Sequence, residues 1–369
     1  MNAAAGAFDG LNKYIRITDI DEESRCYIDE NPVSPKGELD DKYLVLENDI
    51  LFARTGASTG KTYLYKKSDG KLYFAGFLIR ISVNCDNSST FVYNATLTDR
   101  YNRWVRLTSM RSGQPGINSQ EYSSYKTYYP LLPEQNKIAS FLKKLDQRIE
   151  KQRQLIEALK SYKRGLSTAL FSRRIRIANA GESQLPEWKK RSLGEVFSER
   201  TERARGDEKL LAVTINNGVQ DRETLELKDN SSEDKTNYKV VHIGDLAYNS
   251  MRMWQGACGV SSYDGIVSPA YTVVFVVDPE MDYAPFWGYY FKEISMLHTF
   301  QRNSQGLTSD TWNLKYDKFS KIIVNTPCLE EQVRIASLID HVSNAITVNE
   351  EMLDRLLNYK RGLLAGMFI

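Results

Sequence analysis

A glycine-rich segment near the start of the chain has the residue types of a phosphate-binding loop. It runs from Gly56 to Thr62 and reads Gly-Ala-Ser-Thr-Gly-Lys-Thr. The nucleotide-binding pattern needs four residues between its two glycines, and this segment has three. A phosphate loop also leads into a helix whose amino end faces the anion, whereas Tyr63–Lys66 has the composition of a strand. We therefore interpret the segment as a tight turn between two strands.

The sequence offers little for catalysis or metal binding. It has no His-Glu-x-x-His pair and no Pro-Pro-Tyr/Phe tetrapeptide of the kind expected in an amino-methyltransferase. Its three histidines stand apart, and its four cysteines form no Cys-x-x-Cys pair. We predict that the chain is not catalytic by itself and that it binds no metal or cofactor directly. We expect its cysteines to be free thiols in a reducing cytoplasm.

Four polar loops carry side chains that are suited to DNA recognition instead. Residues 54–61 follow a predicted strand, and residues 249–256 occupy the matching place in the second half; residues 112–118 and 303–309 precede two long helices. Arginine pairs bidentately with guanine edges, and asparagine and glutamine pair with adenine edges. Ordinary solvated turns remain the alternative for each loop. The candidate DNA contacts are Arg54, Ser58, Thr59, Lys61, Gln114, Asn118, Asn249, Arg252, Gln255, Ser304, Gln305 and Thr308.

One helical segment, which could hold these loops in place, occurs twice in the chain. Its copies run from Glu134 to Phe171 and from Glu331 to Phe368, and they align without a gap at an offset of 197 residues. Both copies contain Glu-Gln, Ile-Ala-Ser and Tyr-Lys-Arg-Gly-Leu at corresponding positions. A repeat of this length predicts two equivalent structural elements.

The apolar residues of both copies recur at alternating spacings of four and three, which is the period of a coiled-coil seam. Gln152 corresponds to Asn349 and Lys163 to Lys360, so even the polar interruptions coincide. We expect each helix to be about 57 Å long at ~1.5 Å per residue. We also expect the copies to pack on each other about an internal pseudo-two-fold, and the alternative is two unrelated amphipathic helices. The spacer residues singled out are Leu142, Leu145, Ile149, Ile156, Leu159, Ile339, Ile346, Leu353 and Leu356.

The helices divide the chain into two similar blocks, which predicts an α+β fold. The expected domains are 1–133, a first helix at 134–172, a linker at 173–185, a second domain at 186–329 and a second helix at 330–369. Both blocks are rich in β-branched and aromatic runs bounded by turn residues. The predicted strands are Asp49–Ala53, Thr62–Lys66, Leu72–Val83, Val240–Tyr248 and Tyr271–Val277, and helices are predicted near Phe91–Arg111 and Ala284–Arg302.

Composition and charge restrict the function further. The chain has 369 residues, of which 41% are hydrophobic, without a run long enough for a membrane span. It opens with no signal-peptide pattern, so we expect a cytoplasmic protein. The net charge is +2, although Glu134–Arg176 carries 12 basic and 4 acidic residues. Strong DNA binding usually needs a clear positive excess, so we expect partners to assist it.

The doubled Pro-x-Leu-x-Glu-Gln…Tyr-Lys-Arg-Gly-Leu helices, at 130–166 and 327–363, resemble those of the specificity subunits of type I restriction–modification systems, the HsdS family. Pro186–Gly194 resembles the usual opening of a target recognition domain, and Asp49–Gly56 resembles its mid-domain strand and loop. The resemblance covers nearly the whole chain.

The resemblance implies two target recognition domains that each read half of a bipartite site in double-stranded DNA. The long helices would form an antiparallel spacer that sets the gap between the half-sites and docks two methyltransferase subunits. Those subunits would bind S-adenosylmethionine, and restriction subunits would use ATP and Mg²⁺. A coiled-coil scaffold without its own DNA readout is the competing hypothesis.

The first block departs from this family pattern at its opening. In the second block, Pro186–Gly194 stands well before Thr214, and the first block has no matching stretch before Thr18. We therefore expect the opening of the first domain to be missing or replaced; the alternative is that this divergent domain starts differently.

Overall fold

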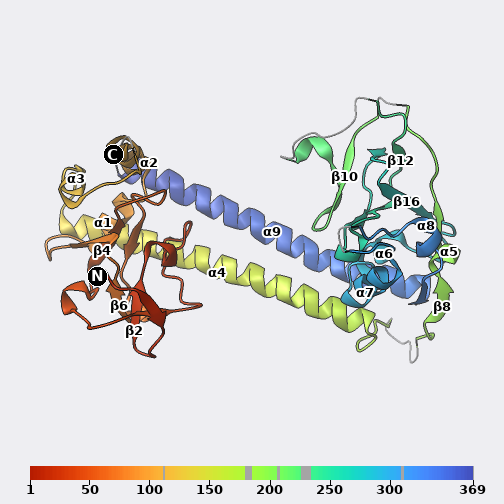
Figure 1. Cartoon of the computed structure of the whole chain (residues 1–369), viewed down its shortest axis with the longest axis horizontal. Helices are drawn as coiled ribbons and strands as arrows, with labels where there is room; N and C mark the ends of the chain where they lie inside the picture. The colour runs from red at the N-terminus through yellow and green to blue at the C-terminus, as the bar shows by residue number, and fades with distance from the viewer. Residues whose placement is uncertain (111–112, 179–184, 206–207, 226–233, 309–310, 369) are drawn as a thin grey trace. The chain divides into compact units, whose positions relative to one another are not determined.

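The computed structural model describes the chain except residues 111–112, 179–184, 206–207, 226–233, 309–310 and 369. The chain forms two compact units. Unit 1 comprises Met1–Leu155 and Asn349–Ile369, and unit 2 comprises Ile156–Val348. Each unit contains a β-rich region and part of each long helix (Figure 1).

Unit 1 is built on a three-stranded antiparallel sheet with the order β5-β4-β7. Strand β4 is buried along its whole length. Successive side chains of a strand point to opposite faces, so Ile50 and Phe52 pack on the helices while Leu51 and Ala53 pack on the β2–β6 pair. The strands are β1 (Ala5–Ala7), β2 (Asn12–Ile15), β3 (Val33–Pro35), β4 (Asp49–Ala53), β5 (Thr62–Leu64), β6 (Lys71–Phe74) and β7 (Leu78–Ser82). The helices of this region are α1 (Ser89–Ala95), α2 (Asp99–Ser109) and α3 (Ser119–Ser123).

Unit 2 has the corresponding sheet with one strand more, in the order β14-β13-β16-β9. Its main core joins this sheet to an aromatic cluster on α6 and α7, which includes Phe286, Trp287, Phe291 and Phe300. The strands are β8 (Lys189–Ser192), β9 (Phe197–Glu199), β10 (Leu211–Thr214), β11 (Gly218–Asp221), β12 (Lys239–Val241), β13 (Leu246–Asn249), β14 (Cys258–Val260), β15 (Gly265–Val267), β16 (Tyr271–Val276) and β17 (Ile323–Thr326). The helices are α5 (Leu193–Val196), α6 (Ala284–Tyr290), α7 (Ile294–Asn303) and α8 (Tyr316–Phe319).

The predicted α+β class is confirmed, but four predicted elements are divided. Residues 72–83 form β6 and β7, which belong to different sheets, and residues 240–248 form β12 and β13. Each predicted helix of the blocks is likewise two helices. In the first of them, the Thr98 hydroxyl accepts a hydrogen bond from the backbone N–H of Tyr101, which starts a new helix at that point. Composition alone does not predict where such breaks occur.

The two long helices, α4 (Leu132–Phe171) and α9 (Leu329–Met367), confirm the predicted repeat. In unit 1, Gln152 Nε2 donates to Asn349 Oδ1 at 2.7 Å, and Lys360 forms an ion pair with Asp146 at 2.6 Å. The residue numbers fall along α4 as they rise along α9, so the helices pack antiparallel (Figure 1). Leu142, Leu145, Ile149, Ile156, Ile339 and Ile346 are buried, and Leu159, Leu353 and Leu356 are half-buried.

Three further observations bear on the expected chemistry. Cys26, Cys85, Cys258 and Cys328 are free thiols. Among the described residues, His, Cys, Asp and Glu form no group of three or more that could hold a metal ion. None of the helices in the described part of the chain is both long and apolar enough to span a membrane.

Candidate nucleic-acid interface

In unit 1, two of the loops that carry candidate DNA contacts are held against each other. The N–H of Gly56 donates to Pro115 O, and the N–H of Ile117 donates to Arg54 O, both at 2.9 Å. Gly60 has φ +89°, and a Cβ there would lie 2.5 Å from Val105 of α2. The turn therefore requires glycine, both for its left-handed backbone and for its close approach to the helix.

The candidate residues of unit 1 differ in how accessible they are. Arg54 and Gln114 are exposed, and the Gln114 amide lies close to Gly56. Asn118 caps α3 through its side chain. Thr59 Oγ1 donates within the turn to Gly56 O at 2.7 Å. Lys61 is buried, because its ammonium donates to Ile20 O at 2.9 Å and pairs with the Glu22 carboxylate.

The same segment has the Gly-x-Ser-x-Gly spacing of a nucleophile elbow, with Ser58 at its centre. An elbow joins a strand to a helix, but this segment joins β4 to β5 as an antiparallel hairpin. Ser58 Oγ lies 3.4 Å from Glu22 Oε1, and all three histidines of the chain belong to unit 2. The segment is therefore a hairpin turn, as predicted, and Ser58 has the surroundings of a surface hydroxyl.

Unit 2 repeats the arrangement of the paired loops. The N–H of Leu314 donates to Ser250 O at 2.8 Å, as that of Ile117 does to Arg54 O in unit 1. Trp254 and Trp312 reinforce the contact, with ring centroids 5.1 Å apart. Gly256, 196 residues after Gly60, has φ +85°. Leu314 lies beyond the predicted loop 303–309, which is tied to this segment by the backbone pairing of Gln305 with Asn313. The equivalent hydrogen bond therefore joins the candidate loops directly in unit 1, and it joins loop 249–256 to the segment after loop 303–309 in unit 2.

The candidate residues of unit 2 lie on these two loops. Arg252 and Gln255 are exposed. Asn249 Oδ1 accepts from the N–H of Met251 at 3.0 Å. Gln305 pairs its backbone with Asn313 in both directions. Ser304 and Thr308 use their hydroxyls locally, toward Phe300 O and the Thr311 hydroxyl. The predicted loop ends Ser112 and Ser309 lie outside the described residues.

A third element, which the sequence reasoning missed, borders the loops of unit 2. The β10–β11 hairpin turns at Asn216-Asn217-Gly218, where an Asn-Gly pair is a known hairpin signal. Lys292 holds this turn by donating to Ile215 O at 3.0 Å, and burial lowers the pKa of the Lys292 ammonium. A polar groove between the hairpin and the first loop is lined by Val213, Thr214, Ile215, Asn216, Asn249, Arg252, Ala257 and Tyr271.

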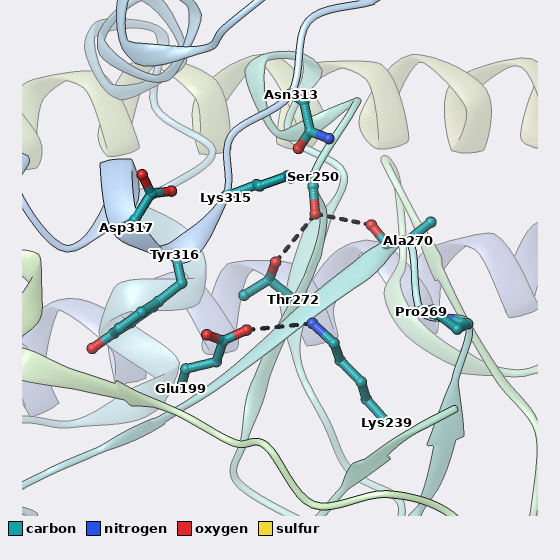
Figure 2. Close-up of a pocket in the computed structure, with 10 residues that line it drawn as sticks. All are labelled: Glu199, Lys239, Ser250, Pro269, Ala270, Thr272, Asn313, Lys315, Tyr316 and Asp317. Carbon is teal, nitrogen blue, oxygen red and sulfur yellow. Dashed lines mark hydrogen bonds and ion pairs between the residues drawn. The ribbon is translucent and has the colours of Figure 1, made fainter. Parts of the chain in front are cut away.

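A second cavity of unit 2 lies beside β9, β12 and β16, and Ser250 of the first loop lines it (Figure 2). Ser250 Oγ donates to Ala270 O at 2.9 Å and shares a hydrogen bond with the Thr272 hydroxyl. Lys239 forms an ion pair with Glu199 at 3.3 Å. The Ser250, Thr272 and Lys239 side chains thus find their polar partners within the protein. We therefore interpret the residues that line this cavity as structural support for the loops.

The repeated Glu-Gln motif at the start of each long helix has a positioning role. Gln332 Oε1 accepts from the N–H of Tyr283 at 2.8 Å, while its Nε2 donates to Met281 O and Pro327 O at 3.1 Å. Gln135 makes the corresponding contacts with the N–H of Ser88 and with Pro130 O, both at 2.9 Å. Each glutamine thereby fixes the start of a long helix to the start of α1 or α6, whose region carries the loops.

Comparison with known proteins identifies the architecture. The family described as type I restriction modification DNA specificity domain matches residues 5–161 and 186–358. Three solved structures share the fold at 15–16% sequence identity. The S subunit of a type I restriction–modification system from M. genitalium has a TM-score of 0.57, with 98% of this chain and 89% of that chain covered. The HsdS subunit from Thermoanaerobacter tengcongensis has a TM-score of 0.50, with 95% and 88% covered.

The third structure comes from work on "complex assembly and conformational transition of the type I R-M system" and has a TM-score of 0.54, with 95% of this chain and 90% of that chain covered. The family match spans both blocks and most of both long helices. The chain therefore belongs to the type I restriction–modification DNA specificity (HsdS) family, as a non-catalytic subunit that supplies DNA specificity.

Proposed function

We propose that the paired loops of each unit read one half of a bipartite target in double-stranded DNA. On this proposal, residues 1–133 and 186–329 are the two target recognition domains, 134–172 and 330–369 are the spacer helices, and 173–185 joins the halves. The observation that carries the proposal is the equivalent backbone hydrogen bond in each unit, Ile117 to Arg54 between the loops of unit 1, and Leu314 to Ser250 in unit 2, where Gln305 of loop 303–309 pairs with the neighbouring Asn313. Loops fixed in this way present side chains at low entropic cost.

Arg54 and Gln114 in unit 1, and Arg252 and Gln255 in unit 2, are candidates with exposed side chains. Their guanidinium and amide groups have the donors and acceptors needed to read base edges. The candidates whose side chains are buried or bonded locally would shape the loops rather than contact bases. Lys61 is the clearest example, because its ammonium is already paired inside unit 1.

The long helices would set the gap between the half-sites and dock two methyltransferase subunits. Two apolar positions recur on both helices at the offset of 197 residues. They are Leu155 and Tyr162 on α4, and Met352 and Tyr359 on α9, with side chains between 40% and 57% exposed. Residues seven positions apart lie on one face of a helix, and contiguous exposed apolar side chains mark protein-binding surfaces. Two like surfaces fit two copies of one partner, which would bind S-adenosylmethionine, while restriction subunits would use ATP and Mg²⁺.

The proposal is tested by mapping methylated adenines in DNA from cells that express this chain with its methyltransferase partner. We expect a bipartite motif with a fixed gap. Gln255→Ala should relax one half of the motif, and Gln114→Ala should relax the other half. Asn358→Ala is a matched control on an exposed face of α9 and should leave the motif intact. If both halves stay unchanged in both loop variants, these loops do not read the bases.

A further inference from the structure

In unit 2, the segment Pro186–Glu199 completes the core. Its apolar side chains Trp188, Leu193, Val196 and Phe197 are all buried, and three of them are 0% exposed. They belong to one apolar cluster that also contains the aromatic residues of α6 and the ends of both long helices. Strand β9 covers the outer edge of β16, and β8 pairs with β17. The segment therefore joins the sheet core to the helix pair.

Unit 1 has the same framework, but its described residues contain no counterpart of this segment. Strand β7 occupies the place of β16, and β4 is its one neighbouring strand in the described part of the chain. The corresponding apolar residues form two separate clusters, one around Phe52 and one around Phe91. Ile79, Ile81 and Val83 stay half-buried at the rim of the first cluster.

The polar contacts of the two units differ in the same place. In unit 2, the buried carboxylate of Glu331 accepts hydrogen bonds from Trp188 Nε1 at 3.2 Å and from Arg176 Nη2 at 2.6 Å. In unit 1, the corresponding Glu134 is exposed. The stretch from Lys126 to Leu131, which corresponds to β17 and its end, has no strand, and Tyr128, Tyr129 and Leu131 are 79%, 48% and 82% exposed.

The first residues of the chain do not cover this surface. Strand β1 pairs with β3, and the Met1 ammonium donates to Phe74 O at 2.8 Å. These residues pack against the β2–β6 side of unit 1, which belongs to a different cluster from the β7 rim. Among the described residues, the β7 edge and the exposed residues Tyr128, Tyr129 and Leu131 thus lack the cover that Pro186–Glu199 gives to the corresponding parts of unit 2.

We propose that the β7 edge, together with residues 126–131, is a docking site for a polypeptide segment with the chemistry of Pro186–Glu199. The occupant has an aromatic residue followed, five residues later, by the pattern Leu-x-x-Val-Phe. Its last residues add a strand to the edge of β7, which is a common mode of peptide recognition. Its aromatic residue packs beside Phe91 and Tyr129 and directs a hydrogen-bond donor to Glu134. The proposal is independent of how the loops read DNA.

The test measures binding of a fluorescent synthetic peptide with the sequence Pro186–Glu199 to the full chain by anisotropy. We expect saturable binding at a 1:1 ratio, and a Trp188→Ala peptide should bind roughly tenfold more weakly, as truncation of a central aromatic anchor usually costs. Leu131→Asp in the chain should weaken binding similarly. Position 131 precedes α4, where an aspartate can cap the helix and leaves folding intact. Leu107→Asp, at a 69% exposed position of α2, is the matched control.

Hydrogen–deuterium exchange locates the bound peptide. Protection that appears at Ile79–Val83 and residues 126–131 supports the proposal. The proposal is overturned if binding does not saturate, or if the Trp188→Ala peptide and the Leu131→Asp chain bind as well as the originals. Protection at Val273–Val277 instead would mean that the peptide exchanges with the chain's own segment in unit 2, and would also overturn it. So would a dimer of the chain that protects Ile79–Val83 without peptide, since the occupant would then be a second copy.

Discussion

Replacing Gln332 with leucine tests whether the repeated Glu-Gln motif holds each long helix in place. The side chain is 0% exposed and makes three hydrogen bonds, to Tyr283, Met281 and Pro327. Leucine fills a similar volume but leaves one N–H and two carbonyls without these partners. A buried polar group that loses its partner costs about 1–3 kcal/mol. Water can reach some of the three groups, so the full cost does not apply to each of them. We expect the free energy of unfolding of unit 2 to fall by about 3 kcal/mol.

Gln135→Leu is the matched variant in unit 1. Gln135 also makes three hydrogen bonds, but one of them goes to the side chain of Asn87, which can turn toward water after the substitution. We therefore expect a smaller loss of about 1–2 kcal/mol, in the range of an ordinary hydrogen bond. The two variants differ in the solvent access of the partners rather than in the number of bonds.

Hydrogen–deuterium exchange measures the free energy of local opening in both variants. The amides of α6 report on Gln332→Leu in unit 2, and the amides of α1 report on Gln135→Leu in unit 1. Urea unfolding followed by tryptophan fluorescence gives a second measurement, because four of the five tryptophans lie in unit 2. The reasoning is refuted if Gln332→Leu costs less than about 1 kcal/mol, the net worth of a single hydrogen bond. Equal losses in the two variants would refute the argument from solvent access.

Three other predictions concern the seam, a turn and the thiols. Leu356→Asp puts a charge into the half-buried helix seam and should lower stability by about 2–4 kcal/mol in a thermal or urea melt; an unchanged melt would contradict the paired-helix packing. Gly60→Ala should lower the free energy of unfolding by about 1–3 kcal/mol in a urea melt. Gly10→Ala is the control and should cost less, because a Cβ at a similar φ there meets nothing within 4 Å. Burial raises the pKa of the Cys258 thiol to about 12. Iodoacetamide at pH 8 should therefore label the exposed Cys85 first, as read by mass spectrometry, and early labelling of Cys258 would show that β14 opens readily.

The site was only partly accessible to sequence reasoning. The four loops were predicted from residue type and position, and the structure joins two of them directly in unit 1. In unit 2 the segment that bonds to the first loop is residues 313–314, just beyond the predicted loop 303–309. The inward direction of Lys61 depends on Ile20 and Glu22, which lie about forty residues away in the sequence. The β10–β11 hairpin could have been found from Asn217-Gly218, whereas its attachment to Lys292 depends on a contact between distant segments.

The two long helices, their register and the duplicated plan of the chain could be derived from the sequence. These features follow from a local period of apolar residues and from an exact offset, and Gln152 meets Asn349 as the coinciding polar positions predicted. Tertiary packing, by contrast, sets which side chains of the loops face outward. It also sets where residues 72–83 change sheets and keeps the clusters of unit 1 separate. Those outcomes depend on packing between segments far apart in the chain, and neither residue type nor periodicity encodes such contacts.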